Sequence, residues 1–401
     1  MALACLVVLA GAVDPSKLPH YVNLDVLGLV YLMSIVTGYL EISGVAELVA
    51  ARVSKLGGKQ AVFWMLMASG GLSLLLENVS VVYLFAPVAL KLAQRVGVDP
   101  VAVVVGVALS SDMAGSATMI GDPPAIITAG YLNLNFMDFI IYKGRPSMFF
   151  YTVAAMVAAC MVVATLAARR ATRAGGHSIK PNNEGNAVFA VDRVFLLEVT
   201  VFVIAKIVLL SIRDQIHIPL TLAALVAVGG ITLTRILIHR DTRSVKEAIS
   251  KHDIETPLFL AGVFVISGAF VETGLASQLA NLLLSISGGD VRRLALLLIA
   301  VSVLASAVIY NTPYVAAMLP VVVELARNVG ADPVMLAWAL LIGATLGGTL
   351  TYIGAMGNYA AVRFLAARGY PVGFTKFASI SVPFTLVSVL IGTILYIISW
   401  W

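Results

Sequence analysis

Three carboxylates, Glu77, Asp112 and Asp122, stand inside apolar stretches of this sequence. A charged side chain at the centre of a membrane costs roughly 2.5–3.5 kcal/mol, so an acid in such a stretch is a functional candidate. A carboxylate can bind a proton or Na⁺, and we interpret these three as coupling carboxylates, with Glu77 as the strongest candidate. Asp122 could instead cap the helix that Pro123 and Pro124 interrupt, and Asp112 could be structural.

Small polar side chains gather near these acids, and a second group follows 233 residues later (311 minus 78). A lone Ser or Thr in a membrane helix more often serves packing, but a polar set that occurs twice favours a binding site. We predict that the substrate or ion is bound by Asn78, Ser80, Ser116 and Thr118 in the first group and by Asn311, Thr312, Thr349, Thr351 and Asn358 in the second. Na⁺ could be held at Asn78, Ser116 and Thr118.

The two groups belong to one segment that occurs twice. ENVSVVYLFAPVALKLAQRVGVDP begins at Glu77, YNTPYVAAMLPVVVELARNVGADP begins at Tyr310, and the register continues without a gap. Apolar segments that are interrupted by Gly or Pro in matching positions of two halves are the sequence signature of a secondary transporter. The glycines that recur in register, and that we predict to be hinges, are Gly115, Gly121, Gly348 and Gly354.

The acids do not recur in the second copy. The positions that match Glu77, Asp112 and Asp122 hold Tyr310, Thr345 and Ala355. This asymmetry predicts that coupling to H⁺ or Na⁺ resides mainly in the first half. A membrane-embedded lysine, Lys206, is expected to snorkel toward an interface.

The composition indicates a polytopic membrane protein. Sixty per cent of the residues are hydrophobic and 12% are charged, against roughly 25% charge in a soluble domain. The 401 residues suffice for about ten membrane segments of roughly 20 residues each. The two cysteines exclude a disulfide framework, and G-x-x-x-x-G-K-[ST] is absent, which excludes an ATPase. We expect no enzyme activity, although a channel remains an alternative.

Basic residues in the short loops predict the orientation. Four basic loops can all be cytoplasmic only if two segment pairs, at about 61–96 and 294–328, dip into the membrane and return on the same side. The first hairpin then enters from the cytoplasm and the second from outside. Two hairpins that simply span the membrane are the alternative. The favoured fold is an all-α polytopic protein of two inverted-topology repeats, with re-entrant hairpins and discontinuous helices.

The chain divides into two halves at a polar segment. We predict an N-terminal half at 1–168 with a broken helix at 100–129, and a C-terminal half at 194–401 with a broken helix at 334–358. The cytoplasmic linker at 169–193 is Gly- and Asn-rich, and its basic residues are expected to contact anionic membrane lipids. Nothing in the sequence favours a nucleic acid as a partner.

At these residues the chain resembles the ion transporter superfamily, specifically the branch of melanosomal P proteins, arsenite efflux permeases and citrate transporter-like proteins. Ala125 stands where that branch has Asn after Pro-Pro. The resemblance extends from about Leu24 to the C-terminus, and it depends on Glu77-Asn78, Ala86-Pro87 and Ile120–Pro124 in the first half and on Asn311-Thr312-Pro313, Leu346–Gly348, Ile353-Gly354 and Asn358 in the second.

The resemblance implies a scaffold domain and a mobile transport domain, often in a homodimer, with the site formed by the hairpins and broken helices. Related members move dicarboxylates, arsenite or chloride-like anions, and others exchange Na⁺ for H⁺. We therefore predict a secondary active transporter in the cell membrane that moves a small inorganic or organic anion, arsenite- or carboxylate-like, by alternating access. Na⁺ or H⁺ would be the coupling ion, with no resident cofactor. A Na⁺/H⁺ antiporter is the alternative.

Overall fold

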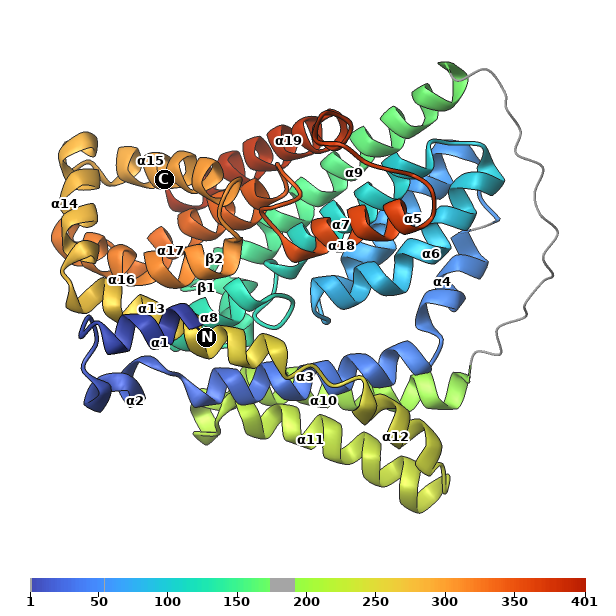
Figure 1. Ribbon diagram of the computed structural model, residues 1–401, viewed down its shortest axis with the longest axis horizontal. Helices are drawn as coiled ribbons and strands as arrows, with labels where there is room; N and C mark the ends of the chain where they lie inside the picture. The colour runs from blue at the N-terminus through green and yellow to red at the C-terminus, as the bar shows by residue number, and fades with distance from the viewer. Residues whose placement is uncertain (1, 54, 174–191) are drawn as a thin grey trace.

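The computed structural model describes residues 2–53, 55–173 and 192–401, which form an almost entirely helical molecule (Figure 1). The strands among these residues form one short antiparallel hairpin, β1 (Ile141–Tyr142) and β2 (Arg145–Pro146). Seven helical segments of the described chain are long and apolar enough to cross a membrane. The predicted all-α polytopic membrane fold is confirmed.

The helices follow one another with short connections. In the first half they are α1 (Ala2–Leu9), η1 (Pro15–Lys17), α2 (Leu18–Tyr21), α3 (Leu24–Ile42), α4 (Val45–Val53), α5 (Gly58–Ser73), α6 (Asn78–Val96), α7 (Pro100–Gly115), α8 (Pro123–Leu132), η2 (Phe136–Phe139) and α9 (Met148–Arg173). In the second half they are α10 (Arg193–Ile216), α11 (Leu220–Leu233), the π-helical turn η3 (Thr234–Ile238), α12 (Thr242–Ser250), α13 (Glu255–Glu272), α14 (Leu275–Ser287), α15 (Val291–Ser306), α16 (Asn311–Val329), α17 (Pro333–Leu341), the π-helical turn η4 (Ile342–Leu346), α18 (Met356–Ala367) and α19 (Phe374–Trp400). Residues 174–191 of the predicted linker lie outside the described residues.

Two helical hairpins enter the molecule from opposite ends. α5 and α6 form the first and α15 and α16 the second, and their bends fall at matching residues, 74–77 and 307–310. α5 and α15 have 16 residues each, about 24 Å at 1.5 Å per residue, which is short of a hydrocarbon core about 30 Å thick. Figure 1 shows the first hairpin at one end of the molecule and the second at the other. The first arms are thus short for a membrane span, whereas α6 (19 residues) is long and apolar enough to cross. The re-entrant, inverted arrangement of the two hairpins stays a prediction.

The two broken helices begin alike because both start with Asp-Pro. Asp99 accepts a hydrogen bond from Val101 N, and Asp332 accepts one from Val334 N, each with Pro at the first helical position. Proline suits that position because it has no N–H to leave unpaired. The helices break at matching residues, 116–122 and 349–355. The second broken helix extends beyond the predicted end at 358 because α18 continues to Ala367.

The first segments of the broken helices form the centre of the core. α7 is buried from Val101 to Gly115, and α17 with η4 is buried from Val334 to Leu346. A helix that is apolar all round is buried all round. After its break each helix packs on the opposite repeat, α8 against α16 and α17, and α18 against α6 and α7. The two repeats are thereby interlocked around the breaks.

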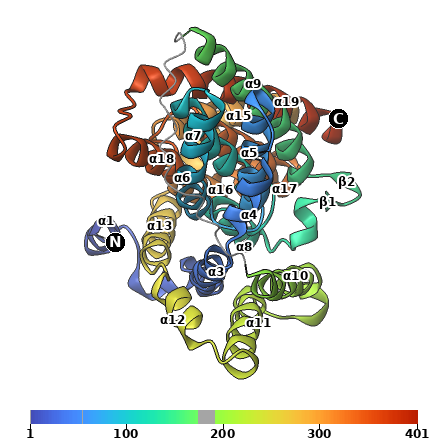
Figure 2. The ribbon, with the colours of Figure 1, turned by 90° about the vertical axis from the view of Figure 1, so that its right-hand side faces the viewer.

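A second group of helices stands apart from this core. α11 packs along α3 and α10, and α12 packs on α3. Figure 2 shows α10, α11 and α12 gathered near α3, away from the bundle that contains α7, α9 and α19. α13 contacts both α3 and α16, and so connects the two groups.

The expectation that Lys206 would snorkel toward an interface is wrong. Its side chain in α10 is 0% exposed, and its Nζ lies 2.8 Å from Sδ of Met33 in α3. The lysine is enclosed because α10 packs against α3 and α11 along its length.

Candidate functional site

Each hairpin bend rests on the break of the broken helix in its own half. Thr118 donates a hydrogen bond from its hydroxyl to the carbonyl of Leu74 (2.5 Å), and Thr351 donates one to the carbonyl of Ala307 (2.6 Å). These four residues match in pairs across the repeat, so the two halves use the same contact. The hydroxyls therefore position the backbone at both bends and breaks.

The recurring glycines are required by close backbone packing at these contacts. A Cβ on Gly121 would lie 2.4 Å from the carbonyl oxygen of Gly115 and 2.5 Å from that of Ser73. A Cβ on Gly354 would lie 2.3 Å from the carbonyl oxygen of Gly348 and 2.6 Å from that of Ser306. A side chain at either position would separate the break from its hairpin. Whether the four glycines also act as hinges stays a prediction.

The three candidate carboxylates meet where hairpin 1 contacts the first break. Asp112 accepts a hydrogen bond from Nδ2 of Asn78 (2.8 Å), while its Oδ2 has no partner. Asp122 accepts one from the N–H of Ala125 (2.9 Å), and its Oδ2 also has no partner. Both aspartates are 0% exposed. Asp122 thus caps α8, as one interpretation predicted, and keeps one oxygen available.

Glu77 caps the second arm of hairpin 1. Its carboxylate accepts hydrogen bonds from the N–H (3.0 Å) and the hydroxyl (3.2 Å) of Ser80. Glu77, Asp112 and Asp122 interact electrostatically with one another. No ion pair found among the described residues includes any of the three. The site therefore concentrates uncompensated acidic groups.

A cavity borders two of these acids, Glu77 and Asp122, and lies against the end of α3, the start of α13 and the α12–α13 loop. Its wall includes Glu77, Ser80 and Asp122 from the predicted site, together with residues of α3 and the loop. The sequence analysis missed the polar residues of that second wall, because they lie between apolar segments and far from the repeat. They are Ser34, Thr37, Glu41, Lys251, Asp253 and Thr256.

The three charged residues of this second wall already have partners. Lys251 pairs with Glu41 (2.9 Å), and Asp253 caps α13 by accepting hydrogen bonds from the N–H groups of Glu255 and Thr256. Asp253 also interacts electrostatically with Glu77. An Asp followed by Glu and Thr at the start of an apolar run is a capping signal, but nothing in the sequence indicates that it faces Glu77.

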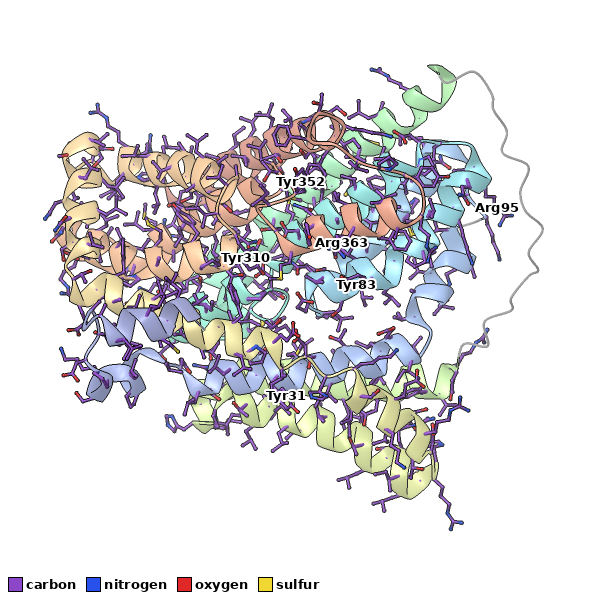
Figure 3. The ribbon with its side chains drawn as sticks, viewed as in Figure 1. Tyr31, Tyr83, Arg95, Tyr310, Tyr352 and Arg363 are labelled. Atoms are coloured by element: carbon purple, nitrogen blue, oxygen red, sulfur yellow. The ribbon has the colours of Figure 1, made fainter. Side chains whose placement is uncertain are left out.

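The second half brings its own polar residues to the same centre. Tyr310, which matches Glu77, interacts electrostatically with Glu77, Asp112 and Asp122. Figure 3 shows Tyr310 in the middle of the molecule. The bend of hairpin 2 therefore lies close to the acids of the first half, and the two repeats contribute to one site.

Most predicted polar side chains of the second half bond within that half. Asn358 donates to the carbonyl of Thr351 (3.2 Å), and Thr312 donates to Oδ1 of Asn311 (3.3 Å). Thr349 bonds to the carbonyl of Leu346 and to Thr385 of α19. Nδ2 of Asn311 and Oδ1 of Asn358 are buried and have no hydrogen-bond partner.

The hydroxyls of the possible Na⁺ site are used by the backbone. Ser116 donates to the carbonyl of Met113 (2.9 Å), Thr118 donates to that of Leu74, and Asn78 binds Asp112. Across the described residues, no group of three His, Cys, Asp or Glu side chains could hold a metal ion. A site with single carboxylates and occupied hydroxyls suits a proton. It also suits a monovalent cation bound by one carboxylate with neighbouring amide and carbonyl oxygens.

Comparison with known proteins identifies the relatives of this fold and site. The family model described as the citrate transporter CitMHS matches residues 1–241 and 199–401. An uncharacterized transporter of Mycobacterium tuberculosis is 31% identical over 93% of this chain and 85% of its own length. The P protein of Homo sapiens is 26% identical over 98% of this chain and 56% of its own length. The resemblance predicted from the motifs is confirmed.

A solved structure shares the architecture. The YdaH transporter of Alcanivorax borkumensis, described as having an unusual topology, matches with a TM-score of 0.63 over 95% of this chain and 87% of its own, at 16% identity. That likeness concerns the fold alone. The family model covers the whole chain, and the relatives are transporters. The chain is a multi-span membrane protein that belongs to the citrate transporter family, CitMHS.

Proposed function

We propose that this protein is a secondary active transporter that moves a small anion, a carboxylate or an oxyanion, across the cell membrane with H⁺ or Na⁺ as the coupling ion. Citrate, which the family description names, is the first cargo to test. The transport bundle would move relative to the group around α3, so that the central site opens to each side in turn.

The observation that carries the proposal is the set of buried acids at hairpin 1. Asp112 and Asp122 are 0% exposed and each has one oxygen without a partner. A buried, unpaired carboxylate favours the uptake of a proton or a cation, because either removes the cost of a bare charge in a membrane. Asn78 holds one oxygen of Asp112 in place, which leaves the other oxygen free to bind the coupling ion.

A Na⁺/H⁺ antiporter is the second candidate, and one observation favours it. The cavity is lined by four carboxylates, of Glu41, Glu77, Asp122 and Asp253, and by a single basic residue, Lys251, which is paired with Glu41. Such a wall attracts cations and repels anions. In this alternative the two cations compete for the same acid, and no anion is required.

Transport by the purified protein in liposomes tests the proposal. We expect citrate uptake that an imposed pH or Na⁺ gradient accelerates, and we expect Asp112→Asn to abolish the acceleration by the gradient. The variant keeps the shape of the side chain and removes the unpaired charge, so it should fold with at least the thermal stability of the wild type. Asp332→Asn, which breaks an ion pair with Lys143 at a residue that lines neither of the two cavities, is the matched control and should retain coupled uptake.

Two results would change the proposal. Gradient-driven uptake of citrate that persists in Asp112→Asn would exclude this carboxylate from coupling. Exchange of Na⁺ for H⁺ in liposomes that hold no organic or inorganic oxyanion, lost in Asp112→Asn, would establish the antiporter instead. A homodimer and contacts between the linker and anionic lipids belong to the same proposal and are checked by mass in detergent and by lipid dependence.

A further inference from the structure

A buried lysine lies outside the site described above, in the group of helices around α3. Lys206 belongs to α10, within a segment apolar enough to cross a membrane, and its side chain is 0% exposed. Because α3 and α11 enclose it, water does not reach its amino group. An ionisable side chain inside a membrane span is a functional candidate, since its charge is costly there.

The amino group of Lys206 has no counter-ion. Nζ lies 2.8 Å from Sδ of Met33 in α3, and a thioether is only a weak hydrogen-bond acceptor. Across residues 2–53, 55–173 and 192–401, no ion pair includes Lys206. A buried ammonium without a paired charge costs free energy. Packing by itself therefore does not account for a lysine at this position.

Met33 connects this lysine to the cavity that borders Glu77 and Asp122. One face of α3 forms a wall of that cavity, because the lining residues recur at intervals of three and four. The α3 residues on this wall are Val30, Met33, Ser34, Thr37, Gly38 and Glu41. The side chain of Met33 thus contacts both the cavity and the amino group of Lys206. Lys206 lies directly behind the α3 wall.

The cavity in front of that wall carries an excess of negative charge. Its carboxylates are those of Glu41, Glu77, Asp122 and Asp253, and its one basic residue, Lys251, is paired with Glu41. Oδ2 of Asp122 is buried and has no hydrogen-bond partner. Such a wall repels an anion. Charges in a protein interior act over longer distances than in water, so an ammonium behind Met33 can alter this field without touching the bound ion.

We propose that Lys206 sets the ion preference of this cavity by placing a positive charge behind its α3 wall. The ammonium offsets part of the field of the carboxylates, and a small anion can then approach acids that would otherwise exclude it. The carboxylates in turn supply the opposite charge that α10, α3 and α11 do not provide at Lys206. The effect on the anion rests on the anionic cargo of the proposed function, whereas the effect on the coupling cation does not.

Lys206→Met tests this role, because it removes the charge and keeps an unbranched side chain. Replacement of a buried charge by an apolar side chain is often neutral or stabilising, so the variant should melt no lower than the wild type. We expect the affinity for citrate and inorganic phosphate, measured from the rise of the melting temperature with ligand, to fall roughly tenfold. One unit charge changes an ion's affinity by about that factor across roughly 12 Å of protein.

The coupling cation should respond in the opposite direction. Lys206→Met should bind Na⁺ more tightly, because a repelling charge has been removed. If H⁺ is the coupling ion, the pH response of uptake should move to higher pH. A purely structural role of Lys206 would weaken the binding of both ions, so the opposite signs identify an effect of charge.

Two further variants separate charge from packing. Lys376→Met removes the same charge from an exposed position of α19 that lines neither cavity, and should keep both wild-type affinities. Met33→Lys combined with Lys206→Met exchanges the two side chains, keeps a Met beside a Lys and returns the charge to the cavity wall. This double variant should bind the anion at least as tightly as the wild type and Na⁺ less tightly. It keeps the test valid if Lys206→Met alone does not fold.

The outcomes distinguish this inference from the proposed function. Wild-type affinities for the anions and the cation in Lys206→Met, or a parallel loss of both, would overturn the role of Lys206 and leave anion transport standing. A wild-type protein that responds to Na⁺ or pH but to neither anion, and that transports neither, would overturn the anionic cargo. Tighter cation binding in Lys206→Met would then still support the effect of the charge, and unchanged cation binding would overturn it as well.

Discussion

At the scale of single residues, the molecule distinguishes polar groups that serve the backbone from those left available. Ser116, Thr118 and Thr351 donate their hydroxyls to carbonyls of neighbouring turns. Asp112 and Asp122 each keep one oxygen without a partner. In a membrane interior a carboxylate without hydrogen-bond partners costs free energy. We therefore expect such a group where a proton or a bound ligand neutralises its charge. The acids are therefore better candidates for ion binding than the hydroxyls.

A charged residue outside the membrane spans provides a test of pH dependence. Asp241, between η3 and α12, accepts hydrogen bonds from Ser244 and pairs with Arg235 (2.5 Å). The bonds from Ser244, followed by the charge of Arg235, hold the pKa of Asp241 below its ordinary value. Asp241→Asn should lower the free energy of unfolding by roughly 1–2 kcal/mol at pH 7.

The direction of the pH dependence follows from the lowered pKa of Asp241. The carboxylate stabilises the folded protein above the unfolded pKa of about 3.9, and this contribution disappears as the pH falls through the lower folded value. The difference in melting temperature between wild type and Asp241→Asn should therefore be constant near neutral pH and shrink below about pH 4. Glu247→Gln, which loses an exposed pair with Lys251, should change little at any pH. A difference that grows on acidification would contradict the assignment.

At the scale of elements, the site depends on each hairpin bend meeting a broken helix at its break. Both halves achieve this with the same parts. A Thr hydroxyl donates to a hairpin carbonyl, and a pair of glycines packs so closely that a Cβ on Gly121 or Gly354 would clash with a carbonyl oxygen. Backbone groups released by a break can be satisfied in a membrane only when protein surrounds them. The hairpins surround the backbone groups at the breaks with protein. The breaks in turn hold the hairpin bends in place through the same contacts.

The glycine contacts predict a pair of equivalent mutational effects. Gly121→Ala and Gly354→Ala place a methyl group within 2.6 Å of two carbonyl oxygens each, so each should destabilise the protein by roughly 1–3 kcal/mol. Gly71→Ala in α5 is the control, because nothing lies within 4 Å of its Cβ and alanine favours a helix. Thermal unfolding in detergent measures all three. Wild-type stability of Gly121→Ala would show that the break and hairpin 1 can separate without cost.

At the scale of the whole molecule, two cavities lie toward opposite ends of α3, α8 and α13. The first contacts Glu41 at the end of α3 and Asp122 at the start of α8, and Glu77 also lines it. The second contacts Asn23 before α3 and Tyr131 near the end of α8, and no acid lines it. Glu77 and Asp122 therefore border the first of these two cavities and not the second. This is the arrangement expected of a single state if the proposed transport proceeds by alternating access.

Labelling of introduced cysteines tests this arrangement. In a background of Cys5→Ala and Cys160→Ala, Ser80→Cys in the first cavity should react with a membrane-impermeant maleimide from one side of a vesicle only. His20→Cys, which lines the second cavity, should react from the opposite side only. Addition of citrate with the coupling ion should change the rate at Ser80→Cys as the bundle moves. Labelling of both positions from the same side would contradict the placement of the cavities.

The sequence by itself determined the parts that depend on local chemistry. Asp-Pro starts the broken helices and Gly and Pro interrupt them, so the repeat predicted the breaks and the bends. The acids near them were evident because they stand in apolar stretches. It also singled out Asn78, Thr118 and their counterparts Asn311 and Thr351, because a polar set that occurs twice in apolar surroundings is evident without a fold.

The tertiary structure alone decided which of those groups are engaged and what faces them. It brought Asp253 to the cavity wall beside Glu77 and Asp122, more than a hundred residues away in the sequence. It also enclosed Lys206, because contacts between distant helices leave no periodic trace in the sequence. It also revealed that the side-chain NH₂ group of Asn78 donates to Asp112, while that of Asn311 has no partner. The two amides have the same type and local context, and their difference lies in the partner that packing places opposite each one.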